Sequence, residues 1–233
     1  SADGGRTWQE LSGLQALPSK ASWSFPPRPW THHVRWIEPD ATVASRIFVG
    51  IELGGVMRSL DGGQSWEDRK PHSQYDCHTL CTHPAEPGVI YEAAGGGFAE
   101  SKDGGHTWRR DDRGRRYHYL WGLAVDPGNP ETIIVSASPG PGAAHNDQYA
   151  EAALYRRTTG ASWLQLETGL PKPRGTRAYV LATHRAEPSI FYAATRRDLY
   201  RSADSGLSWE KLAIDWPDEA RFSTVNAIVA VPS

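Results

Sequence analysis

Three acidic residues of this chain could carry out acid–base chemistry. Asp76 directly precedes an apolar run that predicts a strand, Glu52 follows another such run, and Glu92 replaces a small residue within a third. Glycoside hydrolysis uses a pair of carboxyl groups that face the scissile bond. Asp76, Glu92 and Glu52 are therefore the catalytic candidates.

A second set of residues could bind a ligand. When the predicted inner strands are aligned at their starts, polar and aromatic residues occupy positions where a purely structural strand would carry apolar or small ones. These equivalent positions hold His33, His78, Trp121, Tyr179 and Asn226. Aromatic rings and planar donors suit sugars and carboxylates. The candidate ligand-binding residues are His33, Arg35, His78, Tyr119, Trp121, His145, Arg177, Tyr179 and Arg196.

A simpler alternative is that these residues satisfy one another. A buried arginine needs a carboxylate or a ligand anion. Arg35 would then pair with Glu52 or Glu92, and the histidines would cap the ends of strands.

No cofactor motif accompanies the candidates. The sequence lacks a nucleophile elbow, a phosphate loop and a clustered zinc motif. A group of histidines could gather with Asp76 around one ion, but no spacing rule supports it. Those histidines are His32, His33, His78 and His145. We therefore expect neither a cofactor nor a metal.

An eight-residue repeat indicates which elements position these residues. Its pattern is Ser-x-Asp-x-Gly-x-Ser/Thr-Trp, and Asp-Gly or Gly-Gly between two strand-like runs predicts a hairpin. Copies occupy 1–8, 59–66, 101–108 and 202–209, with a degenerate copy at 156–163. The repeat residues to which we assign a structural role are Asp3, Trp8, Asp61, Trp66, Asp103, Trp108, Trp163, Asp204 and Trp209. Their tryptophans lie 42 to 58 residues apart, a period typical of propeller blades.

This repeat resembles the Asp-box, or bacterial neuraminidase repeat. Sialidases, sortilin-type receptors and several glycoside hydrolases carry it on β-propellers, at the blade periphery and away from the ligand face. The chain also resembles uncharacterised bacterial glycosyl-hydrolase-like propellers in the runs 91–97 and 136–142. The resemblance implies a fold and no established activity. The arginine motif that sialidases carry near the chain start is absent here.

We predict a single all-β domain over 1–233, a β-propeller of four-stranded antiparallel blades. Residues 1–12 form the outer part of a first blade, which 224–233 complete as a closing inner strand. This blade is incomplete or composite, which suggests a larger ring. The insertion 139–147 could cover the axial funnel. Four full blades occupy residues 31–70, 76–112, 117–168 and 177–214.

Composition excludes several classes of partner. Lys and Arg total 25 against 27 Asp and Glu, so no electrostatic argument favours nucleic acid. No apolar run reaches the roughly 18 residues that a membrane span requires.

Cys77 and Cys81 lie about 13 Å apart in one predicted strand, too far for a disulfide. The low cysteine count favours a cytoplasmic location, and secretion stays open because the first blade is expected to be incomplete.

Two functions remain from the sequence. The first is a binding module whose axial face takes a polar or carbohydrate-like ligand or a protein partner. The alternative is a glycoside hydrolase, sialidase-like or of another Asp-box kind. A structural module with partners at the blade edges is a third interpretation. Carboxyl groups about 5–10 Å apart in an open funnel would favour hydrolysis. Carboxylates closed off by an arginine or a histidine would favour binding.

Overall fold

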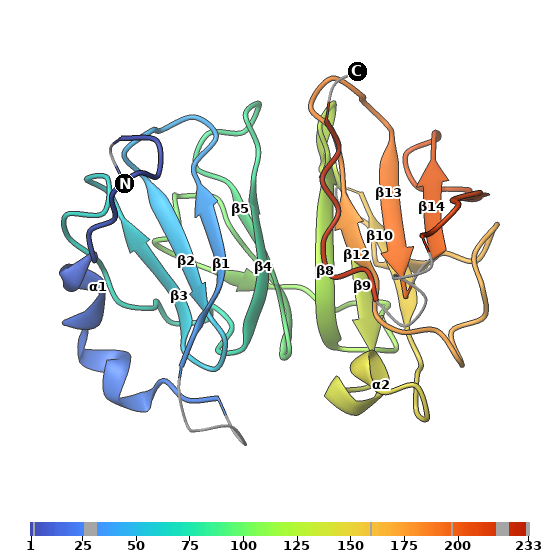
Figure 1. Ribbon diagram of the computed structural model, residues 1–233, viewed down its shortest axis with the longest axis horizontal. Helices are drawn as coiled ribbons and strands as arrows, with labels where there is room; N and C mark the ends of the chain where they lie inside the picture. Colours follow the sequence, from blue (N-terminus) through green and yellow to red (C-terminus); the bar gives the residue numbers. More distant parts are fainter. Residues whose placement is uncertain (2, 26–31, 159, 197, 218–223, 232–233) are drawn as a thin grey trace.

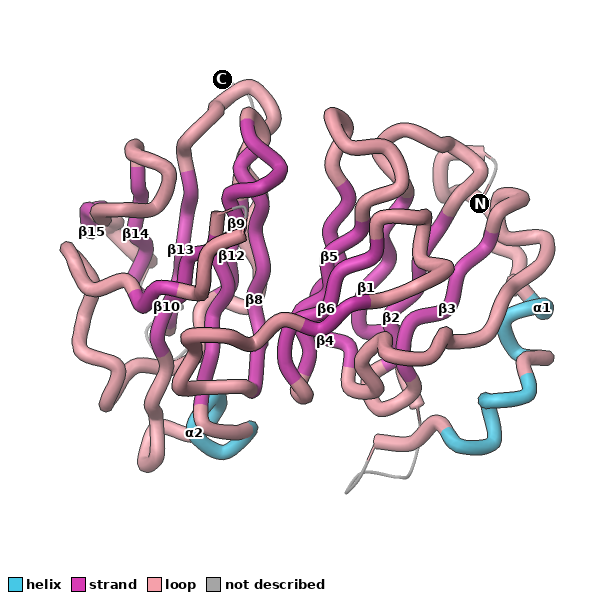
Figure 2. The backbone as a smooth tube through the Cα atoms, turned by 180° about the vertical axis from the view of Figure 1, so that it is seen from behind, coloured by secondary structure: helices cyan, strands magenta, loops and turns pink. Residues whose placement is uncertain are grey.

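The computed structural model describes residues 1–233 except 2, 26–31, 159, 197, 218–223 and 232–233. Four antiparallel sheets follow one another along the chain, three of them with four strands and one with three. Within each sheet, strands that follow one another in sequence pair with each other. Short helices lie only at the margins of these sheets (Figures 1 and 2). The all-β architecture predicted from the sequence is therefore confirmed.

The strands fall within the four segments predicted as blades. The first sheet contains β1 (Val34–Pro39), β2 (Ile47–Ile51) and β3 (Gly55–Ser59). The second contains β4 (Cys77–Thr82), β5 (Ile90–Ala94), β6 (Gly97–Ser101) and β7 (Arg109–Arg110). The third contains β8 (Tyr119–Asp126), β9 (Asn129–Ser138), β10 (Ala153–Arg157) and β11 (Leu164–Gln165). The fourth contains β12 (Val180–Ala182), β13 (Phe191–Thr195), β14 (Asp198–Ser202) and β15 (Glu210–Leu212).

Helical segments lie outside the sheets. The segment before β1 holds α1 (Ser12–Gln15) and a 3₁₀ turn, η1 (Pro18–Ser22). The insertion after β9 forms α2 (Pro141–His145). None of the helices in the described residues is long and apolar enough to cross a membrane.

The structure differs from the prediction in the first sheet and at the ends of the chain. Among the described residues, the first sheet has no fourth strand, and an isolated bridge between Arg58 and Glu67 lies in its place. The described residues of 1–12 form no strand, and 224–231 form none either. Val229 and Val231 are 79% and 74% exposed, so the closing segment lacks the burial on both faces that an inner strand would have. Residues 232–233 lie outside the described part.

The core lies between neighbouring sheets. Apolar clusters join the first sheet to the second, the second to the third, and the third to the fourth. Strands β3, β5 and β6 are buried along their whole length, as expected for strands covered on both faces. A fourth cluster packs Leu14, Leu17 and Trp23 against the first sheet. Packing between sheets therefore supplies most of the burial.

The repeat forms a hydrogen-bonded turn. In the copy at 59–66, the Ser59 hydroxyl donates to Asp61, and the Ser65 backbone N–H donates to the same carboxylate oxygen, each at 2.8 Å. The Trp66 indole donates to the Gly63 carbonyl at 3.1 Å. Gly63 has φ of +92°, a conformation that favours glycine. Corresponding bonds recur around Asp3, Asp103 and Asp204. These contacts support a structural role for the repeat.

Candidate functional site

The inner strands bring the candidate residues together. Strand β1 contacts β4, β4 contacts β8, and β8 contacts β12, so the starts of these four strands lie near one another. His33 and Arg35 belong to the start of β1, and Asp76 and His78 to the start of β4. Tyr119 and Trp121 begin β8, and Arg177 precedes β12. Glu52 and Arg196 follow the second strands of their sheets.

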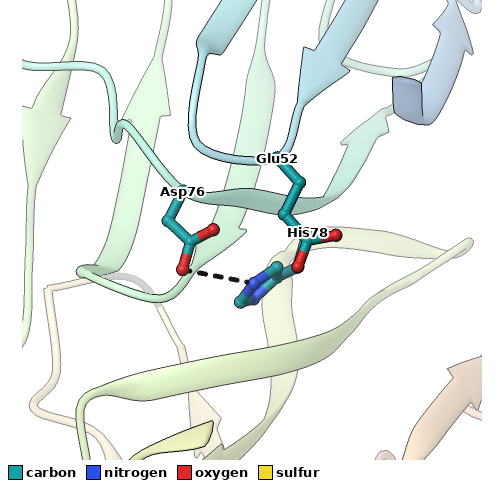
Figure 3. Close-up of side chains that lie close together, drawn as sticks. All are labelled: Glu52, Asp76 and His78. Atoms are coloured by element: carbon teal, nitrogen blue, oxygen red, sulfur yellow. Dashed lines mark ion pairs between the residues drawn. The ribbon is translucent and has the colours of Figure 1, made fainter. Parts of the chain in front are cut away.

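Three of these residues converge on one point. Glu52, Asp76 and His78 each offer one ligand atom, and these atoms all lie within 4.8 Å of one another. Figure 3 shows both carboxylates beside the His78 ring. His33 Nε2 lies 2.7 Å from a carboxylate oxygen of Glu52, and because a carboxylate only accepts, His33 is the donor. Glu52 and Asp76 therefore form a close carboxylate pair with histidines on both sides.

His78 is held rigidly in this cluster. Its side chain is fully buried, and Nδ1 lies 2.5 Å from the Leu120 carbonyl, to which it donates. The ring lies between Tyr119 and Trp121, with centroid distances of 5.0 and 4.9 Å. Nε2 faces Asp76 Oδ2 at 3.5 Å and has no hydrogen-bond partner among the described residues.

Irregularities in strand pairing orient several of these side chains. The register shifts between Val34 and Trp36 in β1, between Cys77 and Thr79 in β4, and between Leu120 and Leu123 in β8. The residues within these shifts include Arg35, His78 and Trp121. A bulge redirects a side chain and is common beside functional sites. Three neighbouring inner strands thus depart from regular pairing where their candidate residues lie.

Aromatic and basic residues line a cavity beside the cluster. Its volume is about 470 Å³, and Arg35, Trp121, His145 and Arg177 lie in its wall. The Arg35 guanidinium lies 4.4 Å from the centre of the Trp121 ring, and the His145 ring lies 4.2 Å from it. Asn226 also lines this cavity and a smaller neighbouring one of about 180 Å³.

Arg35 is the least satisfied of these residues. It is half-buried and stacked on Trp121, and it forms no hydrogen bond or ion pair with any described residue. The proposed pairing with Glu52 or Glu92 is therefore absent from the described part of the chain. A guanidinium in this state can still donate to a ligand that enters the cavity.

His145, which lies in the cavity wall, also contacts Tyr119. Burial of the ring lowers the pKa of His145 to about 4, and the nearby positive charges of Arg177 and Arg35 act in the same direction. His145 is therefore neutral at pH 7. Its Nε2 can accept a hydrogen bond from the Tyr119 hydroxyl, which lies 3.3 Å away.

Asp147 is a residue of this face that the sequence reasoning did not single out. Its Oδ1 lies 2.5 Å from both Arg177 Nε and Arg196 Nη2. Asp147 belongs to the insertion predicted to cover the funnel, and its place in that insertion was the signal that could have identified it.

Two candidates, Glu92 and Tyr179, belong neither to the cluster nor to the cavity wall. Glu92 is fully buried in β5 and accepts the Gln74 backbone N–H at 2.9 Å. Burial raises the pKa of Glu92 to about 8, so its carboxyl is mostly protonated at neutral pH. Tyr179 is 1% exposed and packs between the third and fourth sheets, with its ring 6.4 Å from that of Tyr200. Alignment of strand starts did not reveal that these two side chains turn into the packing between strands and sheets.

Both cysteines are free, as the sequence predicted. Cys77 is buried, and burial raises the pKa of its thiol well above the ordinary range. Neither thiol contributes to the cluster of Glu52, Asp76 and His78.

The four successive antiparallel sheets indicate a β-propeller, and known proteins support this in structure. No family model matches the chain, and no curated protein matches it in sequence. Similar solved structures include an ancestral GH74 enzyme, the GH74 xyloglucanase from Xanthomonas campestris and the GH74 enzyme of Niastella koreensis. Their TM-scores are 0.65, 0.62 and 0.60, and their identities are 18%, 21% and 15%.

These matches cover most of this chain and little of the other proteins. They include 80%, 79% and 75% of this chain but only 24%, 30% and 28% of the respective structures. At identities this low, the likeness establishes the fold alone. The chain thus has a β-propeller fold like that of GH74 glycoside hydrolases.

Proposed function

We propose that the chain binds a polar, carbohydrate-like ligand in the cavity at the starts of its inner strands. The observation that carries this proposal is Arg35, a half-buried guanidinium that lies in the cavity wall without a carboxylate partner among the described residues. Arginine recognises planar acceptors such as carboxylates through paired hydrogen bonds. A sugar with an acidic group would therefore suit the cavity better than a neutral one.

The neighbouring residues support the same ligand class. Trp121 presents aromatic surface, and neutral His145 and Asn226 add polar groups. Arg177 and Arg196 share Asp147, so they are partly neutralised and add less attraction for an anion than Arg35 does. The resemblance of the repeat to the Asp-box is consistent with ligand binding on this face.

Binding can be tested by titrating the chain with acidic and neutral oligosaccharides in a calorimeter, after a glycan-array survey has selected the probes. We expect Arg35→Gln and Trp121→Ala to weaken binding at least tenfold. Arg185→Gln and Trp8→Ala are matched controls, since Arg185 is exposed and Trp8 is 82% exposed. Unchanged binding in both cavity variants, or no binding by the wild-type chain, would contradict the proposal.

Glycoside hydrolysis is the second candidate function. The convergence of Glu52 and Asp76 favours it, because retaining glycosidases place their carboxyl groups about 5–5.5 Å apart. The likeness to GH74 enzymes adds to this argument as an analogy of fold. The contact of His33 with Glu52 and the proximity of His78 to Asp76 weigh against it, since each carboxylate already faces a histidine.

A panel of chromogenic glycosides and polysaccharides, xyloglucan included, tests hydrolysis. If the pair is catalytic, Asp76→Asn and Glu52→Gln should each lower turnover at least a hundredfold. Turnover that survives in both variants would exclude this pair. Absence of any turnover in the wild-type chain would leave binding as the function.

A further inference from the structure

The cluster of Glu52, Asp76 and His78 has a geometry that neither ligand binding nor hydrolysis requires. Two donors bound to one metal ion at about 2.0–2.6 Å each cannot lie farther apart than about 4–5 Å. The three donor atoms here all fall within 4.8 Å of one another. We propose that Glu52, Asp76 and His78 hold a divalent transition-metal ion, contrary to the expectation from the sequence that the chain carries no metal.

The strongest support is the orientation of His78. Its Nδ1 donates to the Leu120 carbonyl, so the neutral ring carries its hydrogen on Nδ1 and presents a lone pair at Nε2. That lone pair is fully buried, has no hydrogen-bond partner among the described residues, and faces Asp76. A lone pair turned toward two carboxylates is repulsive unless a positive charge lies between them.

The distance between His78 Nε2 and the Asp76 carboxylate favours a metal ion between them over a shared proton. Nε2 and Asp76 Oδ2 are 3.5 Å apart, whereas a charge-assisted N–H···O bond spans about 2.7–2.9 Å. Two ligands 3.5 Å apart subtend a nearly tetrahedral angle at an ion that lies about 2.1 Å from each. The separation therefore suits joint ligation of one ion better than a direct hydrogen bond.

The residues around the cluster orient its donor groups, as the residues around a metal site do. Ligating histidines usually donate their other ring nitrogen to a carbonyl or carboxylate, which fixes the ring. His78 does this through Leu120, and the rings of Tyr119 and Trp121 hold it on both sides. His33 binds Glu52 and orients the second carboxylate. Gly95 leaves room for the carboxylate of Asp76, since a Cβ at Gly95 would lie 2.0 Å from Asp76 Oδ2.

The donor set indicates the kind of ion. Ca²⁺ and Mg²⁺ prefer oxygen ligands alone, whereas imidazole suits Zn²⁺ and its transition-metal neighbours. One imidazole with two carboxylates fits Zn²⁺ or Mn²⁺ and leaves coordination positions for water or a ligand. The ion would lie beside the cavity that Trp121 lines. This inference does not depend on the proposed ligand binding, and it would remove Glu52 and Asp76 from acid–base roles.

Calorimetric titration of the chelator-treated chain with Zn²⁺ and Mn²⁺ tests the site, with Ca²⁺ as the comparison ion. We expect one Zn²⁺ per chain, at least tenfold tighter binding of Zn²⁺ than of Ca²⁺, and a higher unfolding temperature in the presence of Zn²⁺. His78→Asn is the decisive variant, because an asparagine amide can still donate to Leu120 while it lacks Nε2. We expect this variant to bind Zn²⁺ at least tenfold more weakly.

His72→Asn is the matched control, an exposed histidine whose φ of +69° asparagine tolerates. It should bind Zn²⁺ as the wild type does. If His78→Asn does not fold, Asp76→Asn and Glu52→Gln decide by the same tenfold criterion. The proposal is overturned if the wild-type chain binds no Zn²⁺, if Ca²⁺ binds equally well, or if binding survives in the folded variants.

Discussion

Glu92 illustrates how one buried carboxyl couples stability to pH. Its side chain is fully buried, and its carboxyl accepts a hydrogen bond from the Gln74 backbone N–H at 2.9 Å. Burial raises the pKa of Glu92 from the ordinary 4.5 to about 8. The folded state therefore holds a proton that the unfolded chain releases at much lower pH. The stability contribution of Glu92 is complete below about pH 4.5 and is lost as the pH rises to about 8.

We expect Glu92→Gln to flatten this dependence, since glutamine keeps the acceptor oxygen and cannot ionise. Relative to the wild type, the variant should gain stability of the order of a few kcal/mol between pH 5 and pH 9. Urea unfolding of both proteins at pH 5, 7 and 9 measures this difference in the free energy of unfolding. An identical pH dependence in the two proteins would show that Glu92 does not titrate in this range.

Residue types identified part of the site from the sequence, and packing decided the rest. Glu52, Asp76 and His78 were all named as candidates, because each departs from the residue type expected at its strand position. Glu92 and Tyr179 satisfied the same criterion, yet Glu92 is buried within the second sheet and Tyr179 packs between the third and fourth sheets. Whether a side chain faces the axis or the neighbouring sheet depends on register, and a shift of one residue reverses it. The register shifts at the inner strands have no signature in the sequence pattern.

At the scale of elements, the repeat hairpins offer an internal comparison. Asp103 accepts from the Ser101 hydroxyl at 2.8 Å, the Thr107 backbone at 2.8 Å and the Thr107 hydroxyl at 2.6 Å. Asp3 has the corresponding bonds in its own turn. The two copies differ in packing, because Trp108 is 7% exposed and Trp8 is 82% exposed.

Asp103→Ala should therefore destabilise the chain by about 1–3 kcal/mol, because it leaves several donors of a packed turn unpaired. Asp3→Ala should leave the unfolding midpoint unchanged, since its turn packs little surface against the sheets. Chemical unfolding of the two variants measures the contrast. Equal losses in both would mean that the turn stabilises the chain without help from its tryptophan.

The hairpins were predictable because their chemistry is local. Each turn is satisfied by side chains within eight residues of one another, so the pattern alone specifies it. The degenerate copy departs in an informative way, since the Trp163 indole donates to Asp111 rather than to its own turn. The strands predicted for the chain ends depend instead on partners elsewhere, and local sequence could not specify those.

At the scale of the whole molecule, a buried ion cluster ties the second sheet to the third. Arg157 of β10 lies 2.5 Å from Glu100 of β6 and 3.1 Å from Asp111, and all three side chains are almost fully buried. Its guanidinium also lies 4.6 Å from the Phe98 ring and 5.2 Å from the Trp163 ring. These contacts join elements far apart in sequence.

Removal of Arg157 should leave two buried carboxylates, Glu100 and Asp111, with the exposed arginines Arg109 and Arg113 as their partners. We expect Arg157→Ala to lower the free energy of unfolding by about 3–5 kcal/mol. Arg109→Ala is the matched control, because Arg109 contacts the same Glu100 but its side chain is 64% exposed. That control should lose less than about 1 kcal/mol. Urea unfolding distinguishes the two, and a small loss in Arg157→Ala would mean that water replaces the guanidinium.

The hydrogen bond from His78 to the Leu120 carbonyl links the cluster of Glu52, Asp76 and His78 to the third sheet. Glu52 comes from the first sheet, Asp76 and His78 from the second, and Leu120 from the third. Any occupant that binds this cluster consequently resists the separation of three successive sheets. Local opening between them would slow when the cluster is occupied, and amide hydrogen exchange in β1, β4 and β8 would report that slowing together. Occupancy of the site would then influence the order in which the sheets of the propeller separate during unfolding.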